Sequence, residues 1–367
     1  MSLPATPLTE RLGCRYPIVQ TAMGWVSDAG LVAATTRAGG FGFLAGATIA
    51  PESLEAEILK VIELTGSHRF GLNFHMFQSN AADCVELAIR HRLAAVSYGR
   101  GPDAATVARL KEAGVLCIPT VGALKHAVKA EAMGADMITI QGSEGGGHTG
   151  SVPSTILLPQ VLDSVKVPVI AAGGFSTGRG LAAALAAGAA GIAMGTRFLM
   201  TSNSPTPAST LERYLAVEDP AHIKVSLAVD GMRHRMIDNA FIRQLEEAGP
   251  LRRLLIALRS ARRWQRETGM THRQALGILR RALREDPAAL AQTVMAANQP
   301  VLLQHSMVEG RAEAGILPSG QVAASINSLI SVEELIETIV NDAERCLARL
   351  SLARQETAEG STTAEVN

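Results

Sequence analysis

The stretch VPVIAAGGFSTGRGLAAALAAGAAGIAMGTRF (167–198) contains an apolar run, a segment of helical periodicity and a second apolar run in succession. Short runs of this kind, rich in Val, Ile and Ala and bounded by glycine, are typical of strands buried on both faces of a parallel sheet. Six similar runs precede this stretch: YPIVQ (16–20), FGFLAG (41–46), FGLNF (70–74), AAVSYG (94–99), VLCIPTV (115–121) and MITIQG (137–142). Eight strands that alternate with helices predict a closed (β/α)8 TIM barrel, with an open doubly wound sheet as the alternative.

The composition points to a small-molecule partner. Among the 367 residues, 47% are hydrophobic but only 4% are aromatic, which favours an α/β fold over an all-β fold. The formal net charge is zero, so no overall electrostatic attraction to nucleic acid or to an anionic membrane is expected. The four cysteines are scattered, which predicts free thiols and no metal site. Without a signal sequence or an 18-residue apolar run, we expect a cytoplasmic protein.

The strand–helix repeat ends after the eighth run and divides the chain into four parts. We expect residues 1–204 to form the strands and helices of the barrel, and residues 205–318 to form a helical insertion that caps its mouth. Residues 319–350 have long apolar periodicity, which predicts the closing helices of the barrel. Residues 351–367 are expected to be a disordered tail. A homo-oligomer is left open.

Glycines at the ends of the seventh and eighth runs predict a phosphate site. Gly173 and Gly174 let backbone N–H groups approach an anion closely, and a helix that begins near Thr177 would direct its N-terminal dipole there. Gly195 and Thr196 end the next run and offer further donors. In the alternative interpretation these glycines only turn the chain.

Other candidates follow the first, third and sixth runs. In GSEGGGHTG (142–150), His148 is the prominent titratable group and a candidate acid or base, unless backbone groups satisfy it in a structural turn. Glu144 in the same stretch is a second candidate or a carboxylate that braces the loop. Asn73 could bond the pyrimidine edge of a flat ring, whereas His75 is interpreted as a surface or packing residue.

The insertion contains a strongly basic stretch. Ten arginines between 252 and 284 are accompanied by Glu267 as the only carboxylate up to residue 284. Guanidinium groups suit the phosphates of coenzyme A, and we predict substrate binding by Arg252, Arg253, Arg262 and Arg263. A solvated helix face or an oligomer interface is the alternative.

Taken together, PIVQTAMGW, GLNF, GSEGGGHTG, the stretch 169–198 and SGQVA resemble the nitronate monooxygenase family, over about residues 7 to 205. The resemblance implies FMN in a TIM barrel, with His148 as the active-site histidine. The cofactor contacts that it implies are Ala22, Met23, Gly24, Asn73, Gln141, Gly145, Ala172, Gly173, Gly174, Met194, Gly195 and Thr196.

Features of the C-terminal half, such as VDGMRHR (229–235) and VMAANQPVLL (294–303), resemble a narrower group, the IpdC-type flavoproteins of steroid degradation. That resemblance implies a dehydrogenase that puts a double bond into ring C of a bicyclic CoA thioester, with NAD(P) as co-substrate. IPTVG at the end of the fifth run departs from some nitronate-oxidising members. A nitronate monooxygenase, an FMN-dependent enoyl-thioester reductase and a non-catalytic flavin-binding scaffold are the alternatives.

Overall fold

A computed structural model of the chain describes residues 2–364, except Phe77, Ser79, Arg100, 250–254, Ala261 and 264–297. Parallel strands form a closed barrel in the order β1-β2-β3-β4-β5-β6-β8-β9. The barrel strands are β1 (Ile18–Gln20), β2 (Phe41–Leu44), β3 (Gly71–Phe74), β4 (Ala95–Tyr98), β5 (Leu116–Val121), β6 (Ile138–Gln141), β8 (Val169–Ala172) and β9 (Gly191–Met194). The β1–β9 pairing closes the ring, and the predicted TIM barrel is confirmed.

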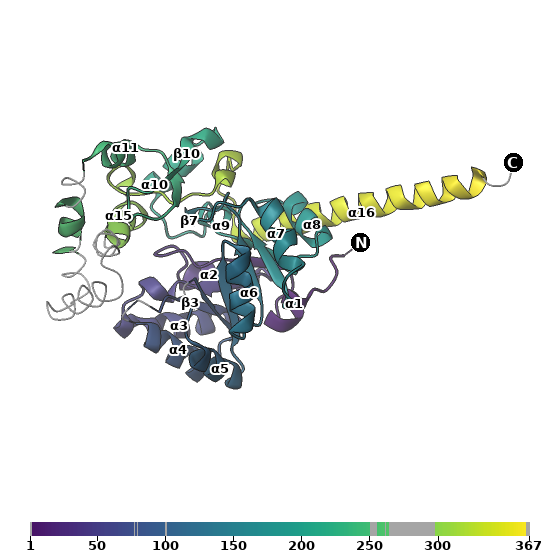
Figure 1. Cartoon of the computed structure of the whole chain (residues 1–367), viewed down its shortest axis with the longest axis horizontal. Helices are drawn as coiled ribbons and strands as arrows, with labels where there is room; N and C mark the ends of the chain where they lie inside the picture. Colours follow the sequence, from purple (N-terminus) through teal and green to yellow (C-terminus); the bar gives the residue numbers. More distant parts are fainter. Residues whose placement is uncertain are drawn as a thin grey trace.

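Each barrel strand is followed by a helix that covers the outside of the sheet (Figure 1). These helices are α2 (Ala29–Arg37), α3 (Pro51–Thr65), α4 (Ala81–Arg90), α5 (Ala104–Glu112), α6 (Leu124–Ala132), α7 (Ser154–Leu162), α8 (Gly178–Ala186) and α16 (Val332–Ala364). Helix α16 contacts both α8 and α2. It therefore completes the outer ring, although more than 130 residues separate it from the end of β9.

The inside of the barrel is apolar, and its N-terminal end is closed. Helix α1 (Pro7–Leu12) buries Leu8 and Leu12 in one cluster with inward-facing strand residues such as Phe41 and Ile170. Side chains from successive strands fill the interior of a small barrel and leave no pore. With the N-terminal end covered, a ligand can enter only at the C-terminal ends of the strands.

The described residues between 205 and 318, called the cap below, contain strands as well as helices. Its described helices are α10 (Ala208–Leu215), α11 (Ala240–Glu247) and α15 (Asn298–Met307), and its strands are β10 (Ile223–Ser226) and β11 (His234–Ile237). The strands add to β7 (Gly147–His148) in an antiparallel sheet of order β10-β11-β7. We expected a largely helical insertion; strands this short, in a segment without a strand–helix repeat, have too little periodicity to be predicted.

The cap has a small core of its own, and other buried cap residues such as Tyr214 and Leu317 belong to a core cluster shared with the barrel. Val229, Met236, Ile242, Leu245 and Ile316 are among the buried members of the cap's own core. Helix α9 (Thr196–Leu199) leads from β9 toward the cap. The 3-10 helices are η1 (Gly46–Thr48), η2 (Pro220–His222), η3 (Ala312–Ala314) and η4 (Gln321–Ser325), of which η4 precedes α16.

The C-terminal boundaries differ from those expected. Within residues 319–350 the structure has one short 3-10 helix and one long α-helix, instead of several closing helices. Helix α16 also continues past Ser351 to Ala364 and extends away from the barrel (Figure 1). Its last part contains Leu, Ala, Arg, Gln and Glu, which favour a helix. Residues 365–367 lie outside the described residues.

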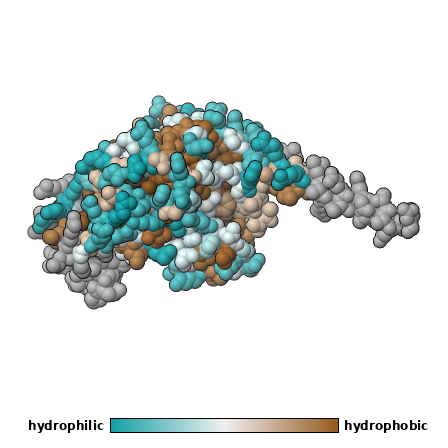
Figure 2. Space-filling model, turned by 90° about the horizontal axis from the view of Figure 1, so that it is seen from above, coloured by the Kyte–Doolittle hydropathy of each residue, from teal (hydrophilic) through white to brown (hydrophobic). Residues whose placement is uncertain are grey.

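The surface carries hydrophilic and hydrophobic areas side by side. In the view of Figure 2, hydrophilic residues cover much of the molecule and hydrophobic residues show between them. Among the described residues, no helix has both the length and the apolar character needed to cross a membrane.

Candidate active site

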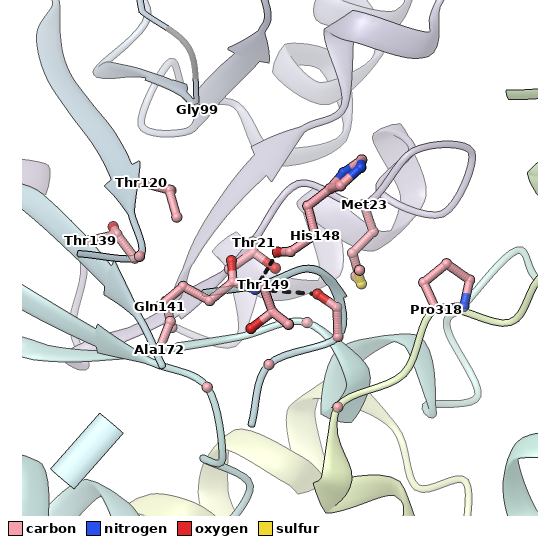
Figure 3. A pocket seen from close by; sticks show the side chains of 18 of the residues that line it. Thr21, Met23, Gly99, Thr120, Thr139, Gln141, His148, Thr149, Ala172 and Pro318 are labelled. Atoms are coloured by element: carbon pink, nitrogen blue, oxygen red, sulfur yellow. Dashed lines mark hydrogen bonds between the residues drawn. The ribbon is translucent and has the colours of Figure 1, made fainter. Parts of the chain in front are cut away.

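A cavity of about 860 Å³ opens at the C-terminal ends of the barrel strands. Its volume is in the range of pockets that hold cofactors and drug-sized ligands. The thirteen residues predicted as cofactor contacts or as the active-site histidine all line it: Ala22, Met23, Gly24, Asn73, Gln141, Gly145, His148, Ala172, Gly173, Gly174, Met194, Gly195 and Thr196. The structure thus brings together residues from across more than 170 positions of the chain (Figure 3).

The loops after β8 and β9 meet at one side of this cavity. Gly173 and Gly174 have φ angles of 91° and 86°, a left-handed conformation that favours glycine. A Cβ at Gly173 would lie 2.9 Å from the backbone nitrogen and oxygen of Gly142. Helix α8 begins just beyond, with the Thr177 hydroxyl accepting from the Gly180 amide at 3.2 Å. Close backbone approach and a helix N-terminus together suit a phosphate group.

Two amide side chains, Asn73 on β3 and Gln141 on β6, also line the cavity. The Asn73 Nδ2 group donates to the carbonyl and the hydroxyl of Ser97, both at 3.0 Å, so its amide oxygen is the group left for a ligand. Gln141 Nε2 donates to the backbone oxygens of His148 at 3.0 Å and Gly146 at 3.2 Å (Figure 3). Each amide is therefore held in one orientation by its donors, and its acceptor is the group that a ligand can use.

The residues present fit an FMN group. A Cβ at Gly195 would meet Thr21 Oγ1 at 3.1 Å and Met23 Sδ at 3.5 Å, so a side chain there would fill this part of the cavity. A Cβ at Gly145 would come within 2.7 Å of Gln141 Nε2. Gly145 and Gly195 thus keep a space open. Met23 forms part of an apolar wall on one side of this space, and the oriented amides of Asn73 and Gln141 line the rest. A flat heteroaromatic ring matches these surroundings, because its faces are apolar and its edge carries hydrogen-bonding groups.

His148 is hydrogen-bonded to a carboxylate from the cap. Its Nε2 lies 2.6 Å from Oδ2 of Asp230. Asp230 is only 1% exposed, whereas the His148 side chain is 37% exposed and lines the cavity. Burial raises the pKa of Asp230, but the hydrogen bond and charge of His148 and the Met232 amide together hold it below its usual value. The carboxylate stays ionised and can only accept, so His148 Nε2 is the donor of this hydrogen bond, and Nδ1 is the ring nitrogen that offers a lone pair when the imidazole is neutral.

A second imidazole lies directly beside His148. His234 on β11 is the cross-strand partner of His148 on β7, and their ring centroids are 4.7 Å apart. His234 is fully buried, and neither of its ring nitrogens has a hydrogen-bond partner in the described part of the protein. Burial, and next the charge of His148, lower the pKa of His234 to about 3, although Asp230 acts in the opposite direction. His234 is therefore neutral near pH 7.

These three side chains are also spaced closely enough for a metal ion. One ligand atom each from His148, Asp230 and His234 lies within 4.8 Å of the others. Two imidazoles and a carboxylate are a common donor set for divalent transition metals. We predicted no metal site because the four cysteines are scattered. That argument did not consider His148, Asp230 and His234, two of which come from the cap and lie far from His148 in the sequence.

Glu144 is a brace for the loop, as one of its two interpretations had it. Its carboxylate accepts from the Ser154 amide at 3.0 and 3.1 Å and from the Ser154 hydroxyl at 3.0 Å. The same hydroxyl reaches Gly173 O at 2.5 Å. Glu144 therefore ties the loop after β6 to the loop after β8 and does not line the cavity. His75, which we interpreted as a surface or packing residue, does line it.

The basic stretch is only partly described. Arg262 and Arg263 do not line the cavity, and Arg263 is paired with Glu309 and lies 3.1 Å from Nε2 of His305. Arg252 and Arg253 lie outside the described residues. The role of these four arginines in substrate binding therefore stays a prediction.

Sequence reasoning missed the three polar residues that the cap brings to the site, which are Asp230, Arg233 and His234. They belong to the segment VDGMRHR (229–235), which attracted notice only through a resemblance. Their proximity to His148 depends on the pairing of β11 with β7 across 86 residues of sequence. The alternation of Asp, Arg and His in a polar segment was the only local signal.

Comparison with known proteins places the chain in a family. The family model for nitronate monooxygenase matches residues 5–342. A (3aS,4S,5R,7aS)-5-hydroxy-7a-methyl-1-oxo-octahydro-1H-indene-4-carboxyl-CoA dehydrogenase from Mycobacterium tuberculosis is 48% identical over 92% of this chain and 96% of its own. The dehydrogenase of the same name from Rhodococcus jostii is 45% identical over 96% and 100% of the two chains.

A solved structure with the same architecture is FabK from Thermotoga maritima, which superposes with a TM-score of 0.77 at 28% identity over 95% of this chain and 99% of that one. The family match spans nearly the whole chain, and the relatives are oxidoreductases. The barrel, the cavity and the sequence thus agree, and the chain belongs to the nitronate monooxygenase family of FMN-dependent oxidoreductases.

Proposed function

We propose that this enzyme desaturates ring C of a bicyclic, steroid-derived CoA thioester, with FMN as its cofactor and NAD(P)+ as its co-substrate. The substrate is of the 5-hydroxy-7a-methyl-1-oxo-octahydroindene-4-carboxyl-CoA type that two relatives are named for, at 45% and 48% identity over nearly their full lengths. The observation that carries the proposal is the His148–Asp230 pair at the mouth of a cavity that fits a flavin.

His148 supplies the base. Because Asp230 fixes the proton on Nε2, the Nδ1 lone pair is available to take the acidic proton beside the thioester carbonyl. Asp230 then balances the positive charge that forms on the imidazole. FMN, when bound, supplies the acceptor for the hydride that leaves the neighbouring carbon.

The remaining residues orient and shield. Asn73 and Gln141 have acceptor oxygens available for the edge of the flavin ring, and the loops that contain Gly173, Gly174 and Gly195 are suited to its phosphate. The cap contributes Met232, Arg233 and His234 to the wall of the cavity beside His148. Proximity and exclusion of water are the usual contributions of a protein to flavin chemistry.

The test is an anaerobic half-reaction. The yellow holoenzyme is mixed with the hydroxylated bicyclic CoA thioester, and flavin absorbance is followed near ~450 nm, where transfer of a hydride to FMN causes bleaching. We expect bleaching in the wild type, recovery on addition of NAD+ or NADP+, and loss of bleaching in His148→Ala with FMN retained. His222→Ala, an exposed histidine of the cap outside the cavity, is the matched control.

A nitronate monooxygenase is the second candidate, because the family model that matches is the one for that activity. It would use the same cavity but pass electrons to oxygen. Rapid oxygen uptake with an alkyl nitronate, together with no bleaching by the thioester, would select it over the dehydrogenase.

A further inference from the structure

Arg233 is the one Arg, Lys, Asp or Glu among the described residues that line the cavity. Among the described residues that line it there are glycines, hydroxyls, amides, apolar side chains and four histidines, but no Asp, Glu or Lys, and Arg233 is the one arginine. Arg233 is exposed, and none of the ion pairs among the described residues includes it. An unpaired guanidinium in a ligand cavity is a receptor for an anion.

The surroundings of Arg233 increase its need for a counter-charge. The nearby Arg235 has a pKa lowered below its usual value, first by burial and next by the positive charge of Arg233. The nearest carboxylate along the chain, Asp230, is already bound to His148 and to the Met232 amide. The charge of Glu144 acts on Arg235 in the opposite direction, whereas an anion bound at Arg233 would offset the positive charge of Arg233 itself.

The backbone fixes Arg233 close to the reacting group. Its carbonyl oxygen accepts from the Thr149 amide at 3.1 Å, so Arg233 lies alongside the residue that follows His148. The two glycine loops that suit the FMN phosphate come from β8 and β9, whereas Arg233 comes from the cap. An anion at Arg233 would therefore be separate from the FMN phosphate, and a second bound molecule would supply it.

We propose that Arg233 binds the phosphates of a nucleotide-bearing substrate and thereby orients its reactive end toward His148. This inference rests on the proposed function, in which CoA thioester and NAD(P)+ both carry a pyrophosphate. The shared chemistry is the phosphate–guanidinium contact, and either substrate is its possible source.

The test measures binding to the FMN holoenzyme in four parallel titrations, with CoA, pantetheine, NAD+ and nicotinamide riboside. The variants are Arg233→Met, which keeps an unbranched apolar stem without the charged guanidinium group, and Arg233→Lys, which keeps a point charge. Arg243→Met is the matched control, because Arg243 is an exposed arginine of the cap that is paired with Asp238 and lies outside the cavity.

We expect Arg233→Met to weaken binding of CoA, of NAD+ or of both by about 10-fold, since a charge-assisted hydrogen bond contributes this much. Arg233→Lys should lose less, pantetheine and nicotinamide riboside should be unaffected, and FMN content should stay the same. The ligand that is weakened identifies the source of the phosphate. Unchanged binding of both CoA and NAD+, equal weakening of the ligands without phosphate, or loss of FMN would each overturn the proposal.

The two proposals fail in different ways. These titrations need no turnover, so a wild type that binds CoA through Arg233 but does not bleach with the thioester contradicts the dehydrogenase and leaves the phosphate site. Normal bleaching together with unchanged binding by Arg233→Met contradicts the phosphate site and leaves the dehydrogenase.

Discussion

Asp230→Asn tests whether the carboxylate from the cap controls the base. The substitution keeps the shape of a side chain that is 1% exposed but removes the charge that accepts from His148 Nε2 at 2.6 Å. An amide can also present its NH2 group to His148, which would select the other tautomer and put the proton on Nδ1. The base would then have no lone pair facing the substrate.

The magnitude follows from the contact that is lost. A hydrogen bond to a charged group contributes about 1.5 to 3 kcal/mol, which corresponds to about 10- to 150-fold in rate if it is realised in the transition state. We therefore expect kcat to fall by that factor, while KM for the thioester and the FMN content change little. Asp230→Glu should recover part of the rate, because it restores the charge in a longer side chain.

The assay is the rate of anaerobic flavin bleaching in a stopped-flow instrument, with FMN content and thermal unfolding measured on the same samples. A structural role alone would lower stability or FMN content together with activity. Wild-type bleaching by Asp230→Asn, or a fall in rate only in proportion to lost FMN, would refute the account of Asp230 as the residue that positions His148.

Three further predictions concern Gly173 in the loop after β8, the buried imidazole of His234 and metal ions. Gly173→Ala should lose FMN and lower the free energy of unfolding by on the order of 2 kcal/mol, because it combines a left-handed φ with a Cβ 2.9 Å from backbone atoms. Gly66→Ala is the control, because Gly66 has φ 63° and nothing lies within 4 Å of its Cβ position. Equal FMN content in the two variants would contradict this prediction. The pKa of His234 is about 3 in the folded protein and near 6.5 in the unfolded chain. Its contribution to the free energy of unfolding is therefore complete above pH 6.5 and falls by about 2 kcal/mol between pH 6.5 and 5. His234→Phe should reduce this fall in denaturant titrations at the two pH values, and an equal fall in the variant and the wild type would contradict the prediction. Zn²⁺ should inhibit by coordinating His148, Asp230 and His234, and inhibition that persists unchanged in His234→Phe would place the ion elsewhere.

The barrel could be predicted because its signal is local and repeated. Each strand from β1 to β9 in the ring is a short apolar run next to a helix, and burial on both faces makes such runs nearly continuous in hydrophobicity. The site at Gly173, Gly174 and Gly195 could also be predicted. Ligands of a TM barrel bind at the C-terminal ends of the strands, and these glycines follow the seventh and eighth apolar runs of the sequence. His148 followed from the same rule.

The cap required the tertiary structure. Strands β10 and β11 are four residues each, and β7 has two, so none has enough periodicity to be recognised. The register that pairs His234 with His148 places Asp230 and Arg233 at the site, and pairing between segments 86 residues apart is decided by packing and not by local sequence.

The sequence by itself therefore determined the barrel, the position of the cavity and the histidine at its mouth, because strand order and strand ends follow from local patterns. Only the tertiary structure decided what surrounds that histidine. Folding of the cap over the mouth brings an ionised carboxylate and a neutral buried imidazole to His148 and leaves Arg233 unpaired, and the burial that sets these charge states exists only when the chain is folded.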